Sequence, residues 1–373
     1  MDLACFGAGE KSRYVRRLIL RHSNHRVLYY VEDQRFEKIG TKIDDMDVIS
    51  VYKLKELYEN GVLGGVIITT AYHKRTVQDM IETCIQLGIR DEDVYLIPNK
   101  TLVTGIPDDG NLLIPYQKCV QIFQLDIHIA DHCNLNCELC CHNSQLVEGE
   151  VLVGYEEYQR DLRQLHKLVP DICNISVLGG EPLLHPDLIH LLQITREIYP
   201  YTNITMVTNG LLLGSSSPEL IECLKRNDIG IAISLYPPMH HRLDEMLKFI
   251  KSTGIKASVK RVQKFFKKFS ATPKFDPREM TALCGYVMGL RNGRISRCVD
   301  SLYVDYFNKK FGKTFPEVNG FDIYDEKWTP IELIHALEEP MELCAYCANK
   351  YTSVDTFPWK QASGNISKED ILY

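Results

Sequence analysis

Three cysteines, Cys133, Cys137 and Cys140, have the spacing CxxxCxxC directly after an alternating apolar run at residues 125–129. The run is typical of a buried strand, so the three thiols leave the end of one strand on a short loop. Soft thiolate ligands select iron–sulfur clusters, zinc or copper(I). Structural zinc sites usually combine paired CxxC or CxxH knuckles with four protein ligands. A group of three therefore favours an iron–sulfur cluster with one iron left open to a reactant.

Three further motifs each follow an apolar, strand-like run, and they are Gly179-Gly180-Glu181-Pro182, Thr208-Asn209-Gly210 and Ser234. This series of CxxxCxxC and GGEP at strand ends, in this order, resembles the radical S-adenosylmethionine (radical SAM) superfamily. For the cysteines taken alone, half of a zinc site remains the alternative interpretation.

The resemblance implies that the three cysteines hold a [4Fe–4S] cluster, whose open iron binds the amino and carboxylate groups of SAM. It implies that the GGEP motif meets the methionyl end of SAM. Gly179 and Gly180 would present backbone to the amine, because a glycine has no side chain to block the approach. Glu181 would accept a hydrogen bond from that amine, and Pro182 completes the motif.

The resemblance also implies contacts from Thr208, Asn209 and Ser234 to the ribose or carboxylate of SAM. Hydrogen bonds that cap the strand ends are the alternative for these three residues. One position departs from the family: Leu139 stands before the third cysteine, where the family often has an aromatic residue beside the adenine. Cys141 follows the three ligands and is a candidate hydrogen-atom donor, with a buried bystander thiol as the favoured alternative.

Composition limits the class of protein. A chain of 373 residues suffices for two or three domains. The net charge of −6 and the lack of a long basic run argue against nucleic-acid binding. The densest basic stretch, residues 260–268, is interpreted as a solvated face, with binding of a nucleotide-linked substrate as the alternative. No run is apolar enough for a membrane span and no signal peptide is evident, so we expect a cytoplasmic protein. Its 13 cysteines are then expected to be metal ligands and buried thiols, not disulfides.

Residues 1–105 are predicted to form a Rossmann-like domain. Strands are expected at 3–6, 27–31, 66–69 and 94–97, with helices near 15–20, 54–58 and 76–87. Such alternation indicates a parallel α/β sheet. Gly7 and Gly9, with Glu32-Asp33 ending the second strand, have a nucleotide-binding layout, in which the carboxylate meets a ribose, although Ser12 replaces the third glycine. The alternative is a degenerate Rossmann-like domain kept for docking. The segment resembles N-terminal domains of bacterial polysaccharide-pathway enzymes, which suggests carbohydrate chemistry.

Residues 106–118 are predicted to be a linker. Residues 119–275 alternate strands, ending near 130, 178, 207, 235 and 262, with helices near 155–168, 187–198, 218–225 and 241–252. The family resemblance implies that this series is a partial (β/α)6 barrel. Its motifs stand at the carboxyl ends of strands, where α/β folds place their ligands.

Residues 276–373 carry a second cysteine group. Cys284 and Cys298 flank the hairpin signal Arg291-Asn292-Gly293, and Cys344 and Cys347 form a CxxC knuckle. Spacing alone does not separate zinc from an iron–sulfur cluster here. The arrangement resembles the twitch domain, a shortened SPASM domain, and this resemblance implies an auxiliary [4Fe–4S] cluster on all four cysteines.

Together these resemblances imply an enzyme that cleaves SAM to a 5′-deoxyadenosyl radical and removes a hydrogen atom from a sugar, cyclitol or nucleotide-sugar. Oxidation or epimerisation is the expected outcome, with a flavodoxin- or ferredoxin-type electron donor. A radical SAM enzyme that modifies peptides is the main alternative. A protein whose iron–sulfur clusters only carry electrons is an alternative of another class.

Overall fold

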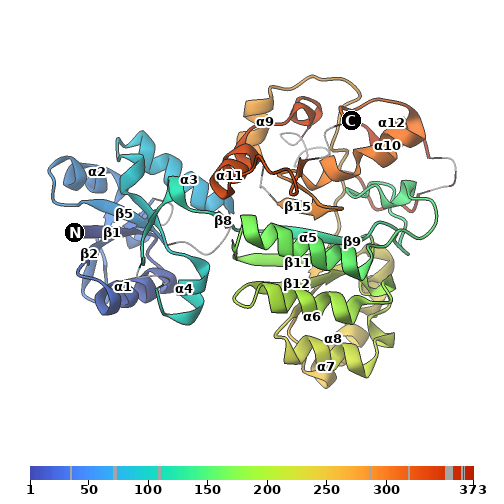
Figure 1. Cartoon of the computed structure of the whole chain (residues 1–373), viewed down its shortest axis with the longest axis horizontal. Helices are drawn as coiled ribbons and strands as arrows, with labels where there is room; N and C mark the ends of the chain where they lie inside the picture. The colour runs from blue at the N-terminus through green and yellow to red at the C-terminus, as the bar shows by residue number, and fades with distance from the viewer. Residues whose placement is uncertain are drawn as a thin grey trace. The chain divides into compact units, whose positions relative to one another are not determined.

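The computed structural model describes residues 1–33, 36–69, 74–107, 111–284, 287–317, 320–348, 356–362, 364 and 366–373. Two compact units are present (Figure 1). Unit 1 contains residues 1–123 and 171–173, and unit 2 contains residues 124–170 and 174–373. Within the described ranges, no helix has the length and apolar character needed to cross a membrane.

Unit 1 is a sheet with helices along it. Its elements are β1 (Asp2–Phe6), α1 (Glu10–His22), β2 (Arg26–Glu32), η1 (Phe36–Lys38), β3 (Lys42–Ile43), β4 (Met46–Ser50), α2 (Val51–Glu59), β5 (Gly65–Ile68), α3 (Lys74–Gln86), η2 (Asp91–Asp93), β6 (Val94–Leu96), α4 (Asn99–Thr104), β7 (Ile114–Pro115), η3 (Tyr116–Lys118), β8 (Gln121–Ile122) and β10 (Asp171–Ile172). The main sheet has the order β3-β4-β2-β1-β5-β6-β7. Its five inner strands, β4-β2-β1-β5-β6, are parallel. The predicted parallel α/β organisation of this part of the chain is confirmed.

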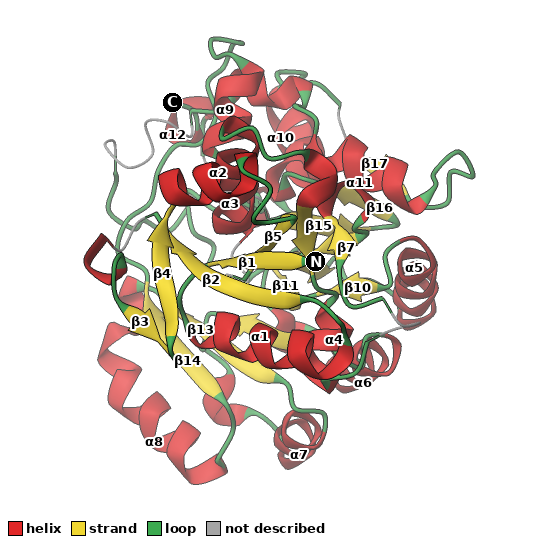
Figure 2. Cartoon of the chain, turned by 90° about the vertical axis from the view of Figure 1, so that its left-hand side faces the viewer, coloured by secondary structure: helices red, strands yellow, loops and turns green. Residues whose placement is uncertain are grey.

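The central strand β1 explains why unit 1 has two hydrophobic clusters, one on each face of its sheet. Ala4 and Phe6 belong to one hydrophobic cluster, whereas Leu3 and Cys5 belong to another. Because successive side chains of a strand point to opposite faces, β1 is buried on both faces of the sheet. Helices border the strands in Figure 2, as this pattern requires.

The glycine turn after β1 is closed by the chain itself. Gly7 has φ +111°, a conformation that L side chains rarely adopt. The Ala8 backbone N–H donates to Glu32 Oε1 at 3.0 Å, and Glu32 is buried. Glu32 therefore stabilises the turn, which differs from its predicted contact with a ribose. Nucleotide binding by unit 1 stays a prediction.

The predicted linker at residues 106–118 contains regular structure at its C-terminal end. Residues 99–104, just before it, form α4; within it, residues 114–115 form β7, which pairs antiparallel with β6, and residues 116–118 form η3. Leu102, Leu112 and Leu113 pack in the same cluster as Leu3, and this apolar burial holds the segment against the sheet. Residues 108–110, at the centre of the predicted turn, lie outside the described residues.

Unit 2 carries the remaining strands and helices. They are β9 (Leu125–Ala130), η4 (Ser144–Leu146), α5 (Tyr155–Leu168), β11 (Asn174–Gly179), η5 (Pro182–Leu184), α6 (Leu188–Ile198), β12 (Asn203–Thr208), η6 (Leu213–Ser215), α7 (Pro218–Arg226), β13 (Gly230–Leu235), η7 (Pro237–Arg242), α8 (Leu243–Thr253), β14 (Ala257–Arg261), α9 (Pro277–Leu283), β15 (Met288–Arg291), β16 (Arg294–Ser296), η8 (Val299–Tyr303), α10 (Val304–Phe311), β17 (Phe321–Asp322), α11 (Pro330–Glu338), η9 (Glu342–Tyr346) and α12 (Lys368–Ile371).

The sheet of unit 2 has the order β14-β13-β12-β11-β9-β15-β16-β17. The five strands β9, β11, β12, β13 and β14 coincide with the predicted β/α series, and they are parallel. Helices α5, α6 and α7 lie side by side along this sheet (Figure 1). The predicted parallel α/β fold of this region is confirmed, and it is consistent with a radical SAM barrel.

The C-terminal part of the chain adds to this sheet. Strand β15 pairs parallel with β9 and antiparallel with β16. Between β15 and β16, Asn292 has φ +50° and Gly293 has φ +68°, as a two-residue hairpin turn with two left-handed positions requires. The predicted hairpin is confirmed. A boundary between two domains near residue 275 stays a prediction, because both parts belong to unit 2.

A buried ion pair holds the end of β9 against β15. Asp131 follows β9, and Arg291 Nη2 donates to its Oδ2 at 2.6 Å. Tyr306 donates to the same oxygen at 2.7 Å. The guanidinium of Arg291 also lies 4.6 Å from the ring centroid of Tyr303. Because Asp131 stands two residues before Cys133, the pair fixes the start of the cysteine loop.

We predict that Arg291→Met lowers the free energy of unfolding by about 3–5 kcal/mol, because it leaves the buried carboxylate of Asp131 without its counter-charge. Urea unfolding followed by circular dichroism measures the change. Lys256→Met is the matched control, because Lys256 pairs with Asp228 at an exposed site and its loss costs about 1 kcal/mol or less. Equal, small losses in both variants would contradict the account of the pair.

Candidate functional site

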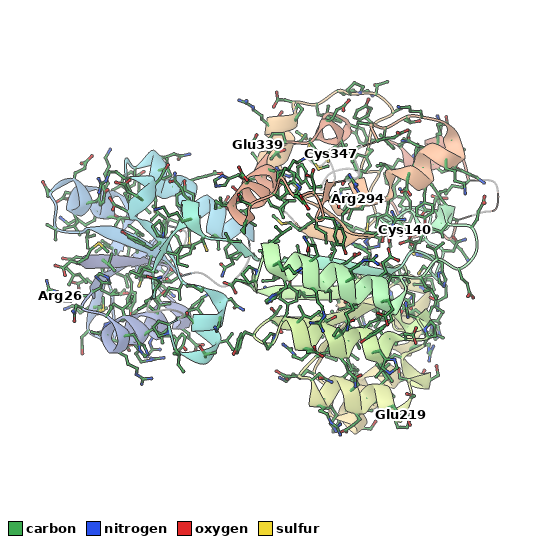
Figure 3. The ribbon with its side chains drawn as sticks, in the orientation of Figure 1. Arg26, Cys140, Glu219, Arg294, Glu339 and Cys347 are labelled. Atoms are coloured by element: carbon green, nitrogen blue, oxygen red, sulfur yellow. The ribbon has the colours of Figure 1, made fainter. Side chains whose placement is uncertain are left out.

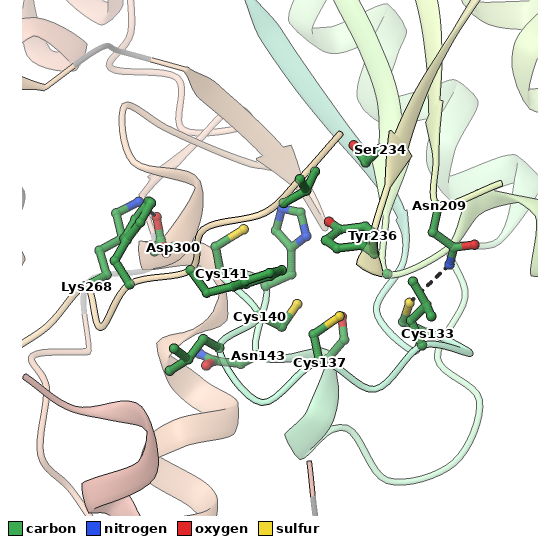
Figure 4. Close-up of a pocket in the computed structure, with 18 of the residues that line it drawn as sticks. Cys133, Cys137, Cys140, Cys141, Asn143, Asn209, Ser234, Tyr236, Lys268 and Asp300 are labelled. Carbon is green, nitrogen blue, oxygen red and sulfur yellow. Dashed lines mark hydrogen bonds and ion pairs between the residues drawn. The ribbon is translucent and has the colours of Figure 1, made fainter. Parts of the chain in front are cut away.

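The cysteine loop opens into a cavity of about 650 Å³ inside unit 2. Cys133, Cys137 and Cys140 all line this cavity, and Figure 4 shows their side chains gathered on the loop after β9. Within the loop, Asn136 has φ +51° and Asn143 has φ +50°, left-handed positions that Asn tolerates and that curl the backbone. The structure therefore brings the three predicted ligands to one cavity.

The three thiols are not arranged for a single metal ion. Among the described residues, no three His, Cys, Asp or Glu side chains converge closely enough to hold one. An iron–sulfur cluster requires a wider arrangement of ligands, because its cysteines bind different iron atoms and so lie farther apart. All 13 cysteines are free thiols, so each of them is available as a ligand, and their role as metal ligands stays a prediction.

Burial sets the protonation of two of these thiols. Desolvation raises the pKa of Cys133 to about 11 and that of Cys137 to about 12. At neutral pH both would stay protonated in the bare protein, so a thiolate here requires a cationic partner. Iron supplies that positive charge, and the donor set therefore suits an iron–sulfur cluster.

The GGEP turn is packed directly against the start of the cysteine loop. A Cβ on Gly179 would lie 2.0 Å from the carbonyl oxygen of Ala130, and one on Gly180 would lie 2.0 Å from that of His132. The Gly180 N–H donates to Ala130 O at 2.6 Å. The two glycines are therefore required by the approach of two backbone segments, a reason that differs from the predicted access for a ligand. Both glycines also line the cavity.

Glu181 is fully buried behind this turn. Its Oε1 accepts from Thr208 Oγ1 at 2.7 Å and from Leu183 N at 3.0 Å. Its Oε2 accepts from Asn209 N at 2.9 Å. Burial raises the pKa of Glu181, and these three donors oppose the shift. Glu181 ties the end of β11 to the end of β12 and does not line the cavity, so the predicted contact with a ligand amine stays a prediction. Pro182 is buried as the first residue of η5.

Thr208, Asn209 and Ser234 all line the cavity. Thr208 is occupied locally, because its hydroxyl donates to Glu181 and accepts from Gly210 N at 3.0 Å. Asn209 caps its own strand end by accepting from Leu211 N at 2.8 Å. The strand-end hydrogen bonds weighed as the alternative are thus present for Thr208 and Asn209. Whether the three residues also contact a ligand stays a prediction.

Each of the three ligand cysteines has one side-chain partner. Asn209 Nδ2 lies 3.7 Å from Cys133 Sγ, a contact drawn in Figure 4. Trp359 Nε1 donates to Cys137 Sγ at 3.1 Å. Burial lowers the pKa of His142, but its hydrogen bond to Cys140, together with the negative charges of Cys140, Asp300 and Asp126, raises the pKa overall. His132 instead bonds the backbone of Val151. Both histidines are therefore hydrogen-bonding neighbours of the loop.

The position of Trp359 is set by backbone pairing. Residues 360–362 run antiparallel to the cysteine loop: Glu138 N donates to Lys360 O at 2.9 Å, and Ala362 N donates to Asn136 O at 2.8 Å. The hydrogen bond from Trp359 therefore has a fixed geometry. The sequence analysis missed this residue, because a partner 222 positions away leaves no local signal beyond an unassigned tryptophan near the C-terminus.

The second cysteine group also lies in unit 2. Figure 3 labels Cys347 of this group and Cys140 of the cysteine loop, both in unit 2. Cys298 pairs with Val287 across the hairpin base, and burial together with the nearby Cys284 raises its pKa. Cys344 Sγ lies 3.6 Å from Thr281 Oγ1, three residues before Cys284. These contacts relate the cysteines in pairs, and a common cluster on all four stays a prediction.

Comparison with known proteins identifies the segment that carries this site. Residues 127–272 match the sequence model of the Radical SAM superfamily. This segment is similar to radical SAM domains. It contains the three cysteines of the loop, the GGEP motif and the strand ends that line the cavity.

Individual relatives match only part of the chain. The 7,8-dihydro-6-hydroxymethylpterin dimethyltransferase of Methanocaldococcus jannaschii is 29% identical over 117 residues, 31% of this chain and 22% of that protein. The GTP 3′,8-cyclase of Clostridium perfringens is 30% identical over 114 residues, 30% of this chain and 35% of that protein. This chain thus spans no more than about a third of these two relatives. The crystal structure of BtrN with AdoMet and 2-DOIA matches 64% of this chain and 96% of that chain, with 15% identity and a TM-score of 0.39.

A radical SAM domain implies a [4Fe–4S] cluster and SAM, and the site fits both. The cluster would be held by the three loop cysteines, of which Cys133 and Cys137 have raised pKa values and need a nearby positive charge to become thiolates. The cavity of about 650 Å³ lies within the usual range for small-molecule sites. Leu139 lines it where the family often has an aromatic residue. Tyr236, stacked on Phe265 with ring centroids 5.9 Å apart, supplies an aromatic wall of the same cavity.

We predict that Trp359→Phe shifts the midpoint potential of the loop cluster to more negative values. A hydrogen bond to a ligand sulfur stabilises the reduced cluster, so its loss disfavours reduction. A redox titration followed by electron paramagnetic resonance measures the potential.

Trp328→Phe is the control, because Trp328 packs against Phe321 and its Nε1 has no partner within the described structure. The chain has two tryptophans, so Trp328→Phe also leaves Trp359 as the single tryptophan fluorophore. Assembly of a cluster should quench that fluorescence strongly. Equal potentials in the two variants, or no quenching, would contradict the assigned contact.

Proposed function

We propose that this protein is a radical SAM enzyme that oxidises or epimerises a carbohydrate-type substrate. One observation carries the proposal: the three loop cysteines, the GGEP glycines and the ends of β12 and β13 line a single cavity. An electron carrier has no use for such a ligand site beside its cluster. The arrangement therefore favours an enzyme over a protein that only stores electrons.

When bound and reduced, the cluster and SAM supply a 5′-deoxyadenosyl radical that removes a hydrogen atom from an unactivated C–H bond. The chain's own residues position the reactants. Glu181 fixes the GGEP turn against the end of β12. Asn209, Trp359 and His142 orient the three thiolates by hydrogen bonds. Apolar side chains such as Val304, Phe307 and Phe315 line the far wall and exclude water.

The four cysteines Cys284, Cys298, Cys344 and Cys347 support oxidation over epimerisation. Oxidation of an alcohol to a carbonyl removes two electrons and two protons. Hydrogen-atom removal would account for one of each, and the hydroxyl proton would be released to solvent. The four-cysteine group, as an auxiliary [4Fe–4S] site, is the proposed acceptor of the other electron. Epimerisation instead needs a hydrogen-atom donor, and Cys141 lines the cavity beside Cys140 as the candidate for that role.

For the substrate we propose a sugar, cyclitol or nucleotide-sugar. The cavity volume suits a small molecule. The two relatives matched above are named for a pterin and for GTP, which are small molecules as well. A peptide-modifying role is the second candidate, although unit 1 is a parallel α/β sheet, unlike the winged-helix leader-recognition domain that peptide modifiers often carry. A cytoplasmic setting and a flavodoxin- or ferredoxin-type donor complete the proposal.

Replacing Cys133, Cys137 and Cys140 together by Ala should abolish SAM cleavage, because no ligand for the cluster remains. The measurement is 5′-deoxyadenosine formed anaerobically with dithionite, quantified by chromatography. Cys223→Ala is the matched control, since that thiol is buried on α7 away from the cavity. Cleavage that survives in the triple variant would refute the assignment.

Replacing Cys344 and Cys347 together by Ala should remove about four irons while the loop site still cleaves SAM. Iron and acid-labile sulfide are counted after anaerobic reconstitution, and circular dichroism confirms that the variant is folded. If a folded variant keeps its full iron content, these cysteines do not hold an auxiliary cluster.

A further inference from the structure

One wall of the cavity is strongly basic. Residues 260–269 begin in the last two positions of β14 and continue beyond it, and most of them border the same space as the cysteine loop. Four cationic side chains of this segment line the cavity, and they are Lys260, Arg261, Lys264 and Lys268. Sequence analysis favoured a solvated face for this segment, and the structure adds that the face borders the cavity. The basic stretch is thus part of the candidate site.

The innermost cation is already neutralised. Lys268 Nζ forms an ion pair with Asp300, and Figure 4 shows the two side chains together next to Cys141. Asp300 is the single carboxylate among the cavity-lining residues that the structure describes. The Lys268–Asp300 pair leaves no excess charge at the inner end of the wall.

The other three cations remain unbalanced. Lys260, Arg261 and Lys264 are solvent-exposed, and within the described part of the chain no carboxylate pairs with any of them. Three positive charges at the opening of a cavity with low-dielectric walls attract anions strongly. An arginine among them favours phosphate, whose oxygens its guanidinium binds in bidentate fashion.

An exposed aromatic ring adjoins these cations. Phe266 lines the cavity and is 41% exposed, which is high for a large apolar side chain. Its neighbour Phe265 is buried and stacks on Tyr236. A ring left open beside unpaired cations suits a planar heterocycle joined to phosphate groups.

We propose that Lys260, Arg261 and Lys264 bind the diphosphate of a nucleoside-diphosphate-linked substrate, with its base near Phe266 and its sugar directed toward the cysteine loop. This inference rests on the proposed function, because it assigns the substrate class of the same cavity. The proposal also gives the three exposed cations a binding role, whereas a merely solvated face would give them none.

The test uses the full-length, cluster-reconstituted protein with uridine diphosphate, inorganic pyrophosphate and uridine as probes in calorimetry. We expect uridine diphosphate to bind more tightly than pyrophosphate, and uridine most weakly. The triple variant Lys260→Ala, Arg261→Ala, Lys264→Ala should weaken uridine diphosphate binding about ten-fold or more. Added salt should weaken binding to the wild type more steeply than binding to the variant.

A matched control removes three exposed lysines that do not line the cavity: Lys248→Ala, Lys251→Ala, Lys256→Ala. It changes net charge equally and should bind uridine diphosphate like the wild type. Equal weakening in both triple variants would overturn the proposal, because it would show a long-range charge effect. Unchanged binding in the first variant, or uridine binding as tightly as uridine diphosphate, would also overturn it.

Anaerobic SAM cleavage without substrate separates this inference from the proposed function. The first triple variant should still form 5′-deoxyadenosine at the wild-type rate. A loss of SAM cleavage with intact uridine diphosphate binding would overturn the proposal, because the cations would then serve the carboxylate of SAM. No cleavage by the wild type would contradict the proposed function, while the calorimetry would still decide whether the wall binds phosphate.

Discussion

The site depends on one close approach between two backbone segments, which a buried carboxylate stabilises. Gly179 and Gly180 lie against the carbonyls of Ala130 and His132 at distances that no side chain permits. Glu181 then joins this turn to the end of β12 through two hydrogen bonds, which Thr208 and Asn209 donate. The ends of β11 and β12 and the cysteine loop are therefore held in fixed positions relative to one another. This arrangement forms the cavity before any ligand enters.

Short sequence patterns correctly predicted the features that depend on neighbouring residues in the chain. The spacing of the three cysteines after an apolar run placed them correctly at the end of β9. The Asn292-Gly293 pair predicted the hairpin, because the turn requires two left-handed residues. Most of the parallel strands of both sheets were found from apolar runs, since parallel strands are buried on both faces, whereas β4 was missed.

Long-range contacts escaped prediction. The role of Glu181 as a tie between strand ends depends on donors 27 and 28 positions away. The pairing of β15 with β9, and of residues 360–362 with the cysteine loop, joins segments that share no sequence pattern. The segment at 106–118 was predicted as a linker from its turn residues, but Leu112 and Leu113 in this segment pack against the core of the sheet.

The central claim is that the cavity hosts radical SAM chemistry beside two clusters. Its most direct test is anaerobic reconstitution of the wild-type protein, with iron and sulfide counted before dithionite and SAM are added. The account predicts about eight irons per chain and the appearance of 5′-deoxyadenosine. A fully reconstituted protein that forms no 5′-deoxyadenosine would contradict it.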